Sequence, residues 1–434
     1  MSAERRTTTI RTDALARVEG EGAMHVRVRD GEVDEVRLEI YEPPRFFEAM
    51  LRGRAFADAP DFTSRICGIC PIAYQLRACA AIEDAFGVVV DERVRELRRL
   101  IYCGEWLESH GIHVFMLHLP DFLGYQGAME MARNGYAEVV ERGLGIKRSG
   151  NELMKAVGGR AVHPVNLRVG GFFRAPSAAE LTGAAEQLKR SREWLGETIR
   201  WAASLDFPDA ERDFELVALR ADGRYPIEGG RMASSGGLDI GPDEFEGHIV
   251  EEQVEHSTAL HAHLRDGGPY LTGPLARYGL NQAQLSPLAR EAAAAAGLEE
   301  VCRNPFKSIL VRLVEMLYAA DEALRLIDGY EPPDPPAAPV EPRAAIGSGW
   351  TEAPRGMLWH RYEIDAAGVI ANARIVPPTS QNQATIEADL RDLVAEQIDL
   401  PDAELGWRCE QAIRNYDPCI SCAAHFLRLD VDRG

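Results

Sequence analysis

Long hydrophobic runs are absent from this chain of 434 residues, although 46% of the residues are hydrophobic. A membrane-spanning helix needs about 18 or more consecutive apolar residues, and no run in the sequence approaches that length. The N-terminal segment contains Arg5 and Arg6 but lacks the apolar stretch of a secretory or twin-arginine signal. We therefore expect a cytoplasmic protein without a membrane span.

Basic residues are also relatively few. The 48 lysines and arginines are outnumbered by 68 aspartates and glutamates, which gives a formal net charge of −20. Nucleic-acid binding depends on clustered basic residues that neutralise phosphates, so we expect no nucleic-acid partner. The sequence shows no internal repeat, and its length is sufficient for a large buried core.

Cysteine is scarce, and in a cytoplasmic chain the eight cysteines are expected to be thiols or metal ligands, not disulfides. Four of them form two Cys-x-x-Cys pairs, Cys67 with Cys70 and Cys419 with Cys422. Two such pairs can provide a four-sulfur site for zinc, nickel or iron–sulfur chemistry. Zinc ribbons usually hold both pairs in one short segment, whereas most of this chain lies between them. The spacing indicates that the two ends of the fold meet at a buried metal, with structural zinc as the alternative.

Strand-like and helix-like patterns follow one another along the chain. Residues 7–45 alternate apolar and polar positions around a turn signal at Asp30-Gly31, and residues 356–376 alternate again around a turn near 366–368. Apolar residues recur at helical intervals in four other segments: residues 73–119, with Pro120 ending the run, 178–204, 284–328 and 385–396. The pattern predicts a helix-dominant α+β fold, with a central helical bundle and smaller β pieces near both termini.

We expect one domain over residues 1–434. Its predicted parts are a β-rich segment (1–60), a helical core (61–330), a stiff proline-rich connector (331–342), a β/α segment that closes the metal site (343–425) and a tail that can be cleaved (426–434).

The context of the two cysteine pairs resembles the nickel-binding signatures of [NiFe] hydrogenase large subunits. The pairs stand in the strings Arg65-Ile-Cys-Gly-Ile-Cys70-Pro71 and Asp417-Pro-Cys-Ile-Ser-Cys422-Ala-Ala-His425. Further strings match the family in the same order: Arg17-Val-Glu-Gly20, Phe47-Glu-Ala-Met-Leu-Arg-Gly-Arg54, Gly158-Gly-Arg-Ala-Val-His163-Pro164, Gly170-Gly171, Gly273-Pro-Leu-Ala-Arg277, Glu352-Ala-Pro-Arg-Gly356 and Pro378-Thr-Ser-Gln-Asn382. The resemblance covers nearly the whole chain and implies the fold of that family.

The resemblance also implies a bimetallic centre. Cys67 and Cys419 would be terminal nickel ligands, and Cys70 and Cys422 would also bridge to an iron that carries carbonyl and cyanide ligands. The family uses this centre to split or form H2. Soft thiolates suit nickel, and a terminal thiolate is a base next to the metal.

Further site residues follow from the same resemblance. Arg355, beside Pro354, would polarise H2 above the metals, which suits a planar donor that is always charged; the alternative is an ordinary salt-bridged arginine. Thr379 would hydrogen-bond a cyanide. Glu19 would relay protons from the terminal thiolate of Cys419; the alternative is an exposed carboxylate in an acidic protein.

A second metal site and a processed tail are implied near the C-terminus. Glu48 and His425 would bind a hard cation, magnesium or iron, with waters completing an octahedral set. The family removes the tail after this histidine, so we expect a maturation endopeptidase to act on residues 426–434. Tyr74 replaces a histidine that many family members carry, and the string Cys70-Pro-Ile-Ala-Tyr-Gln75 resembles the pyridine-nucleotide-linked, sulfhydrogenase-like class.

The remaining histidines and cysteines receive plainer interpretations. His113 and His163 lie in family-like strings and are expected to support the site by hydrogen bonds. Other histidines are interpreted as surface or satisfied core residues: His118, His248, His256, His261 and His263. The cysteines outside the pairs are expected to pack as small apolar side chains: Cys79, Cys103, Cys302 and Cys409.

The predicted function is the catalytic subunit of a cytoplasmic [NiFe] hydrogenase. The other four cysteines lack the spacing of an iron–sulfur ligand set. Electrons therefore require a small subunit with iron–sulfur clusters, followed by flavin-containing diaphorase subunits that use NAD(P). The alternatives are an H2-sensing or assembly protein, a quinone-binding respiratory subunit and a structural-zinc protein. The intact cysteine pairs argue against the respiratory subunit.

Overall fold

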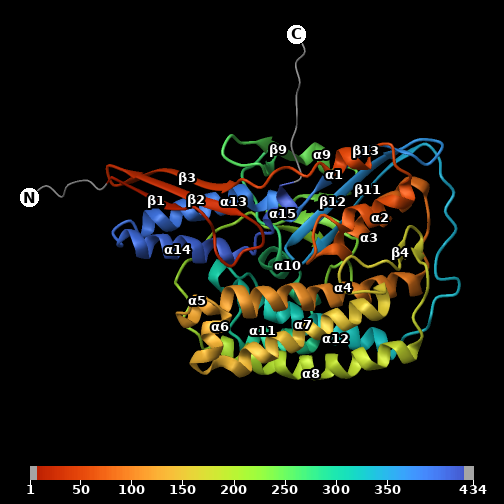
Figure 1. Ribbon diagram of the computed structural model, residues 1–434, viewed down its shortest axis with the longest axis horizontal. Coiled ribbons are helices and arrows are strands. Elements are labelled where there is room, and N and C mark those ends of the chain that lie inside the picture. Colours follow the sequence, from red (N-terminus) through yellow and green to blue (C-terminus); the bar gives the residue numbers. More distant parts are fainter. Residues whose placement is uncertain (1–6, 425–434) are drawn as a thin grey trace, which may run out of the picture.

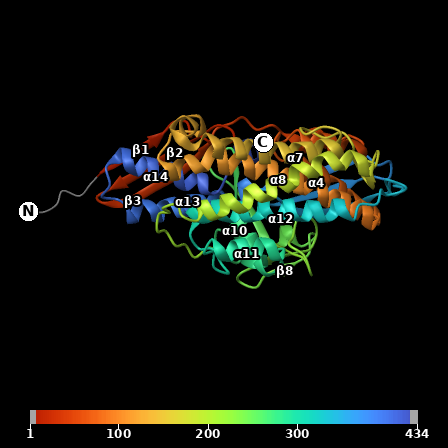
Figure 2. The ribbon, with the colours of Figure 1, turned by 90° about the horizontal axis from the view of Figure 1, so that it is seen from below.

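The structure, a computed structural model, describes residues 7–424. Four long helices lie along the long axis on one side of the molecule (Figures 1 and 2): α4 (Glu92–Ile112), α7 (Ala137–Gly158), α8 (Ala178–Ala202) and α12 (Ser308–Asp328). Each packs against two of the others in the order α4, α7, α8, α12 and back to α4, so they form a closed bundle. The expected helix-dominant α+β fold with a central bundle is confirmed.

Local signals explain where these helices begin. Asp91 accepts a hydrogen bond from the backbone N–H of Arg93 and caps α4. Ser177 and Glu180 form a capping box at the start of α8, the helix expected over residues 178–204.

Two of the expected helices are each divided into two. Residues 73–119 contain α3 (Pro71–Phe86) and α4, because Gly87 adopts a φ of 66° and ends α3. After α4 the chain continues through a π-helical turn, and Pro120 lies in the first turn of α5 (Leu119–Leu123) instead of ending a helix. Residues 284–328 contain α11 (Pro287–Ala295) and α12, separated by a loop in which Gly297 has a φ of 70°.

Two three-stranded antiparallel sheets lie near the chain ends, where smaller β pieces were expected; strand β11 of the second sheet was not predicted. The N-terminal sheet contains β1 (Thr8–Thr12), β2 (Gly22–Arg29) and β3 (Glu32–Ile40), with Asp30 and Gly31 in the predicted turn. The C-terminal sheet contains β11 (Ala345–Ala353), β12 (Gly356–Ile364) and β13 (Ile370–Val376). Residues 331–342 connect the helical bundle to the C-terminal sheet and contain no helix, as their proline content indicates.

Short strands in the middle of the chain were not expected from the sequence. They form small antiparallel sheets inside the segment 61–330: β4 (Leu167–Arg168) with β5 (Gly171–Phe172), β6 (Val217–Arg220) with β7 (Arg231–Ser234) and β8 (Asp239–Ile240), and β9 (Ile249–Gln253) with β10 (Leu260–Leu264). These strands are two to five residues long, too short to give a clear alternating pattern.

The remaining helices connect the bundle to the sheets or follow them: α1 (Phe47–Leu51), α2 (Ala59–Ser64), α6 (Ala128–Met131), α9 (Phe245–His248), α10 (Pro274–Asn281), α13 (Pro378–Glu396), α14 (Asp402–Asn415) and α15 (Ile420–Ala423). The helix expected at 385–396 begins earlier, as α13, and α14 was not expected. No helix in residues 7–424 combines the length and apolar composition that crossing a bilayer requires.

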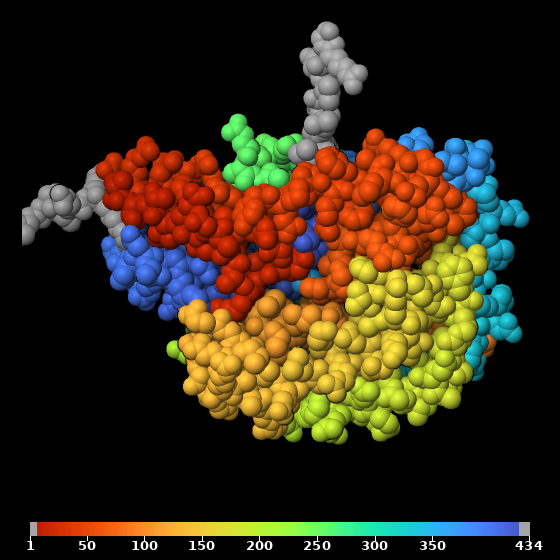
Figure 3. All heavy atoms as spheres, in the orientation of Figure 1, coloured from red at the N-terminus to blue at the C-terminus, as the bar shows by residue number. Residues whose placement is uncertain are grey.

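The two ends of the described chain meet. Helix α13 packs against β3 and β10, and α14 packs against β1. Figure 3 shows part of the C-terminal segment, in blue, between N-terminal residues in red and orange. This closure brings the two cysteine pairs into one place.

Candidate metal centre

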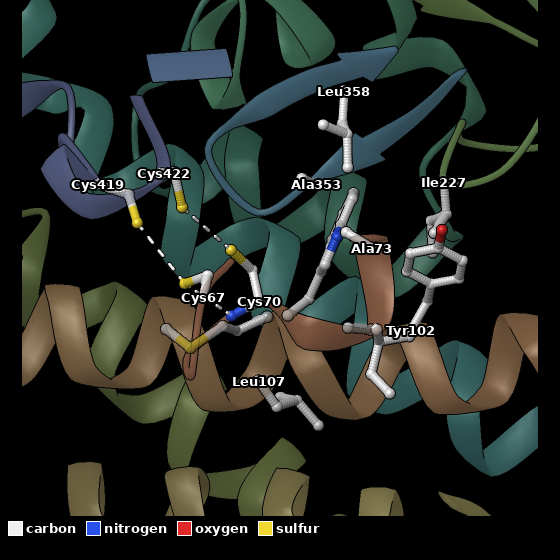
Figure 4. Packing of buried hydrophobic residues seen from close by; sticks show 14 of the residues in the cluster. Cys67, Cys70, Ala73, Tyr102, Leu107, Ile227, Ala353, Leu358, Cys419 and Cys422 are labelled. Atoms are coloured by element: carbon white, nitrogen blue, oxygen red, sulfur yellow. Dashed lines mark hydrogen bonds between the residues drawn. The ribbon is translucent and has the colours of Figure 1, made fainter. Parts of the chain in front are cut away.

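Four cysteine thiols converge in the interior from opposite ends of the chain (Figure 4). The Sγ atoms of Cys67 and Cys419 lie 3.6 Å apart, and those of Cys70 and Cys422 lie 3.8 Å apart. All four Sγ atoms lie within 4.8 Å of one another, and all four residues are buried. The two pairs therefore form a single sulfur cluster.

The first pair lies in the turn between α2 and α3. Pro71 is the first residue of α3, a position where a missing N–H costs no hydrogen bond. Glu105 of α4 accepts hydrogen bonds from the backbone N–H of Ile72 at 2.6 Å and of Ala73 at 3.1 Å. These bonds satisfy N–H groups that the first turn of a helix leaves free. Burial raises the pKa of the Glu105 carboxyl well above its usual value.

The second pair is fixed by α13 and by the N-terminal segment. The backbone N–H of Cys419 donates to Oγ1 of Thr379 at 3.0 Å, and that of Ile420 donates to the carbonyl oxygen of Glu19 at 3.0 Å. Gly20, with a φ of 88°, permits this contact, because a Cβ atom there would lie 2.7 Å from Cβ of Ile420. The Arg17–Gly20 segment therefore helps to hold the C-terminal cysteine pair in place.

The cluster favours at least one thiolate. The Sγ atom of Cys67 accepts hydrogen bonds from the backbone N–H groups of Ile69 and Cys70, each at 3.3 Å. The hydrogen bond with Cys419, together with those to the other two thiols, holds the pKa of Cys67 well below its usual value. Burial raises the pKa of Cys419 well above it. Buried, converging sulfur donors of this kind fit a soft metal ion such as nickel, iron or zinc.

Arg355 lies buried beside the sulfur cluster. Its Nε donates to the carbonyl oxygen of Asp417 at 2.8 Å, one terminal nitrogen lies 3.1 Å from Oδ1 of Asp417, and the other lies 3.3 Å from Oγ of Ser109. Burial alone would lower the pKa of Arg355, but the charges of Asp417 and of thiolates such as Cys419 raise it well above its usual value. A permanent positive charge therefore faces the site.

A second buried arginine fixes the turn that carries Arg355. Arg277 donates to the carbonyl oxygens of the two residues before Arg355, at 2.7 and 2.8 Å. It also forms ion pairs with Glu315 at 2.8 Å and with Glu352 at 3.0 Å, and all of these side chains are fully buried. The segments Gly273–Arg277 and Glu352–Gly356, which are far apart in the sequence, therefore bind each other and fix the position of Arg355.

The glycine of the first string allows close approach to that turn. Gly273 has a φ of 114°, and a Cβ atom on it would lie 2.6 Å from the carbonyl oxygen of Arg355. Only glycine fits both this conformation and this space.

Glu19 lies next to one thiol. Its Oε2 lies 3.1 Å from Sγ of Cys419 and accepts a hydrogen bond from the backbone N–H of Ser421, also at 3.1 Å. The side chain is half-buried. It is thus placed to exchange a proton with the thiol, and it is not a freely exposed carboxylate.

Glu48 lies apart from the sulfur cluster, on α1. Its Oε1 accepts a hydrogen bond from the backbone N–H of Ile375 on β13 at 2.7 Å. Burial raises the pKa of Glu48 to about 7. His425, the other expected ligand of the hard cation, lies outside the described residues, as does the tail 426–434.

The two histidines expected to support the site bond to the backbone around it. His113 donates from Nε2 to the carbonyl oxygen of Arg414 at 2.7 Å, and His163 donates from Nδ1 to that of Ser64 at 2.8 Å. His118 lies 3.0 Å from Oδ1 of Asn415 and is a buried, hydrogen-bonded residue.

Sequence reasoning missed some of the residues that hold the site. Glu105 gives no signal beyond being a charged residue in an apolar helix. The partnership of Arg277 with Glu352 could have been sought, because both residues lie in strings already singled out. Asp417, the acceptor for Arg355, directly precedes the Pro-Cys of the second pair.

A helix-rich fold whose two ends meet around four buried thiols is the arrangement of a metalloprotein with a buried soft-metal centre. Comparison with known proteins identifies its class. Residues 45–157 and 267–425 match the family described as nickel-dependent hydrogenase. The chain belongs to the nickel-dependent hydrogenase family, as its large, catalytic subunit, and it is therefore an oxidoreductase that acts on H2.

Individual relatives agree with this assignment. Sulfhydrogenase 1 subunit alpha of Pyrococcus furiosus is 33% identical over 97% of this chain and 98% of its own length. The NAD-reducing hydrogenase HoxS subunit beta of Cupriavidus necator is 28% identical over 96% of this chain and 94% of its own. A crystal structure of an NAD+-reducing [NiFe]-hydrogenase in the H2-reduced state has a TM-score of 0.85 and 27% identity, and covers 97% of this chain and 100% of that one.

Proposed function

We propose that this chain is the H2-splitting subunit of a cytoplasmic, multi-subunit [NiFe] hydrogenase that exchanges electrons with NAD(P). The observation that carries the proposal is the single buried cluster of Cys67, Cys70, Cys419 and Cys422. When bound there, a nickel–iron centre with carbonyl and cyanide ligands on iron would supply heterolytic splitting of H2. The four thiolates would hold nickel, and Cys70 and Cys422 would be shared with iron.

The chain's own residues have three tasks in this proposal. Arg355 holds a fixed positive charge over the site and orients diatomic molecules, because its guanidinium is pinned by Asp417. Thr379 accepts a hydrogen bond from the Cys419 N–H, which leaves its hydroxyl proton to donate to a cyanide. Glu19 takes the proton from the Cys419 thiol and passes it outward.

The other four cysteines support a need for partner subunits. Within residues 7–424, none of them belongs to a group of three or more potential metal ligands. Burial raises the pKa of Cys79 and Cys409 to about 12, as for packed apolar thiols. Electron transfer out of the site therefore requires a small subunit with iron–sulfur clusters. A flavin-containing NAD(P) subunit beyond it is favoured by the NAD-reducing relatives.

The proposal includes a second metal and a processing step. Glu48 and His425 bind magnesium or iron, and a maturation endopeptidase removes residues 426–434. Mass spectrometry of the chain from the active complex tests the cleavage. A mass that includes residues 426–434 in active enzyme would contradict it.

The central experiment is metal analysis combined with infrared spectroscopy of the complex made with its maturation proteins. We expect about one nickel and at least one iron per chain, with absorption bands of iron-bound carbonyl and cyanide. Cys419→Ser should lose nickel, whereas Cys79→Ser, a buried cysteine outside the cluster, should keep it. Stoichiometric zinc without nickel, or nickel without the infrared bands, would overturn the proposed centre. If H2 reduces a viologen dye but not NAD(P) in the same complex, the proposed electron acceptor is wrong and the proposed metal centre still stands.

A further inference from the structure

A second group of metal-ligating side chains lies outside the sulfur cluster. His256, His261 and Glu387 each offer one ligand atom, and these atoms lie within 4.8 Å of one another. Nε2 of His256 lies 2.8 Å from Oε1 of Glu387, and the two imidazole rings meet edge to face at 5.6 Å. From the sequence alone, both histidines are expected at the surface or in the core; the structure groups them with a carboxylate.

The three ligands come from three separately anchored places. His256 lies in the turn between β9 and β10, His261 lies on β10, and Glu387 lies on α13. The backbone N–H of Thr258 fixes the turn by donating to the carbonyl oxygen of Ile40 at 2.8 Å. Glu387 also accepts from a backbone N–H of β3 at 2.8 Å. The group is therefore held in place before any ligand binds, which lowers the entropic cost of binding.

One ring nitrogen of His261 is buried without a hydrogen-bond partner in the part of the chain that the structure describes. Its side chain is buried, with 7% of the residue exposed, and among the described residues its Nε2 has no hydrogen-bond partner. Leaving a buried polar atom unpaired costs about 1–3 kcal/mol. Burial favours the neutral form of His261 and lowers its pKa, although Glu387 opposes the shift. A neutral imidazole with a free lone pair is the form that binds metals.

We propose that His256, His261 and Glu387 bind a divalent transition-metal ion, with zinc as the expected occupant. Two imidazoles and one carboxylate form a ligand set that zinc and related ions accept, whereas magnesium and calcium prefer oxygen ligands only. Glu252 is paired directly with His261 across the β9–β10 hairpin, on the same face. Its carboxylate or a water would complete the coordination.

The bound ion would act as a structural cross-link. It would tie the β9–β10 hairpin to α13, whose first turn carries the Thr379 that holds Cys419. Next to the turn, Ala259 packs in one apolar cluster with Ile420 and Ala423 of α15. Binding of the metal ion should therefore stabilise the packing of the C-terminal segment, and the ion itself should take no part in H2 chemistry.

The test uses the matured complex, whose sulfur site is already filled, after removal of loosely held metal with a chelator. Zinc is titrated and followed by calorimetry and metal analysis, and cobalt is used as a spectroscopic probe. We expect about one additional equivalent per chain, a cobalt spectrum without thiolate charge-transfer bands, and a higher thermal unfolding midpoint with zinc. His261→Ala and Glu387→Gln should each weaken zinc binding at least ~10-fold.

Matched variants keep the result interpretable. Glu387→Gln keeps an acceptor for the β3 N–H, so it preserves the fold even where His261→Ala does not. His248→Ala, at the end of α9 and outside the group, should bind zinc like the unaltered chain. The proposal is overturned if the matured complex takes up no additional zinc, or if Glu387→Gln binds zinc and gains thermal stability as the unaltered chain does.

Discussion

The Sγ atom of Cys419 lies 3.1 Å from Oε2 of Glu19, although 400 positions separate the two residues. The backbones of the same two residues form a parallel bridge, so the contact is built into the fold. Glu19 is a carboxylate in direct contact with the thiol, so it can accept a proton from it. The relay proposed for Glu19 therefore has a geometric basis and can be tested directly.

Replacement of Glu19 by Gln should stop proton exchange while leaving the site intact. Glutamine keeps the size and the acceptor for the Ser421 N–H but cannot carry the exchanged proton. We expect H2 turnover and H/D exchange with solvent to collapse. Interconversion of para- and ortho-hydrogen should persist, because it requires only reversible splitting of H2. Gas-phase mass spectrometry and Raman spectroscopy measure these activities.

A neighbouring carboxylate provides the control for this experiment. Glu42 accepts hydrogen bonds from Ser421 Oγ and from a backbone N–H, and neither of these contacts involves a thiol. Glu42→Gln should retain both turnover and exchange. Full H/D exchange in Glu19→Gln would show that protons leave by another route, and loss of para–ortho conversion as well would show that the variant damages the metal centre.

Arg355→Lys should lower H2 turnover by ~10²-fold or more, the scale for loss of one preorganised electrostatic donor. Lysine keeps the charge but cannot make the paired contacts to Asp417 and Ser109. Nickel and iron contents should be unchanged. Arg361→Lys, on the following strand and partly exposed, should leave turnover as it is. Wild-type turnover in Arg355→Lys would show that the guanidinium has no part in the reaction.

Gly20→Ala should interfere with closure of the site. Both Gly20 and Gly31 have φ near +80 to +90°, so alanine at either position incurs ~1–2 kcal/mol of backbone strain. Only at Gly20 would the added Cβ also meet Ile420, at 2.7 Å; at Gly31 nothing lies within 4 Å. We expect Gly20→Ala to be less stable than Gly31→Ala by a further ~1–3 kcal/mol and to retain less nickel. Equal stability and nickel content in the two variants would contradict this account.

The sequence was most informative where function restricts residue types within short strings. The cysteine pairs, Arg355 and Glu19 stand in such strings, and the structure places all of them at one site. Three of the four long bundle helices were also visible, because each presents a regular apolar face to the core; α7 was not predicted. The break at Gly87 was missed because apolar spacing continues across it, although Gly87 and the capping residue Asp91 both mark it.

Features that depend on tertiary contact could not be predicted. The strands β4–β10 are short and are stabilised by pairing partners rather than by their own pattern. The grouping of His256 and His261 with Glu387 joins a turn, a strand and a distant helix, and no local spacing encodes it. The ion pairs of Arg277 with Glu315 and Glu352, which together form a clamp, also join distant segments; of these, only the pairing of Arg277 with Glu352 could have been sought from the sequence.

A buried histidine beside this clamp predicts how stability depends on pH. His110 on α4 is fully buried, its Nε2 lies 3.0 Å from Oε2 of Glu315, and the charges of Arg277 and Arg312 also act on it. Burial lowers the pKa of His110 from 6.5 to about 4, although Glu315 opposes the shift. The folded chain therefore resists a proton that the unfolded chain takes up.

The sign of the effect follows from this difference. The contribution of His110 to stability is complete above pH 6.5, the pKa in the unfolded chain, and it decreases as the pH falls toward about 4. Between these values His110 should lower the free energy of unfolding by up to about 1.4 kcal/mol per pH unit. His110→Gln removes this titration, so the stability of the unaltered chain should fall relative to the variant as the pH is lowered from 7 to about 4.5. Urea denaturation of both proteins at several pH values measures the difference, and parallel pH profiles would show that His110 takes up its proton equally well in the folded state.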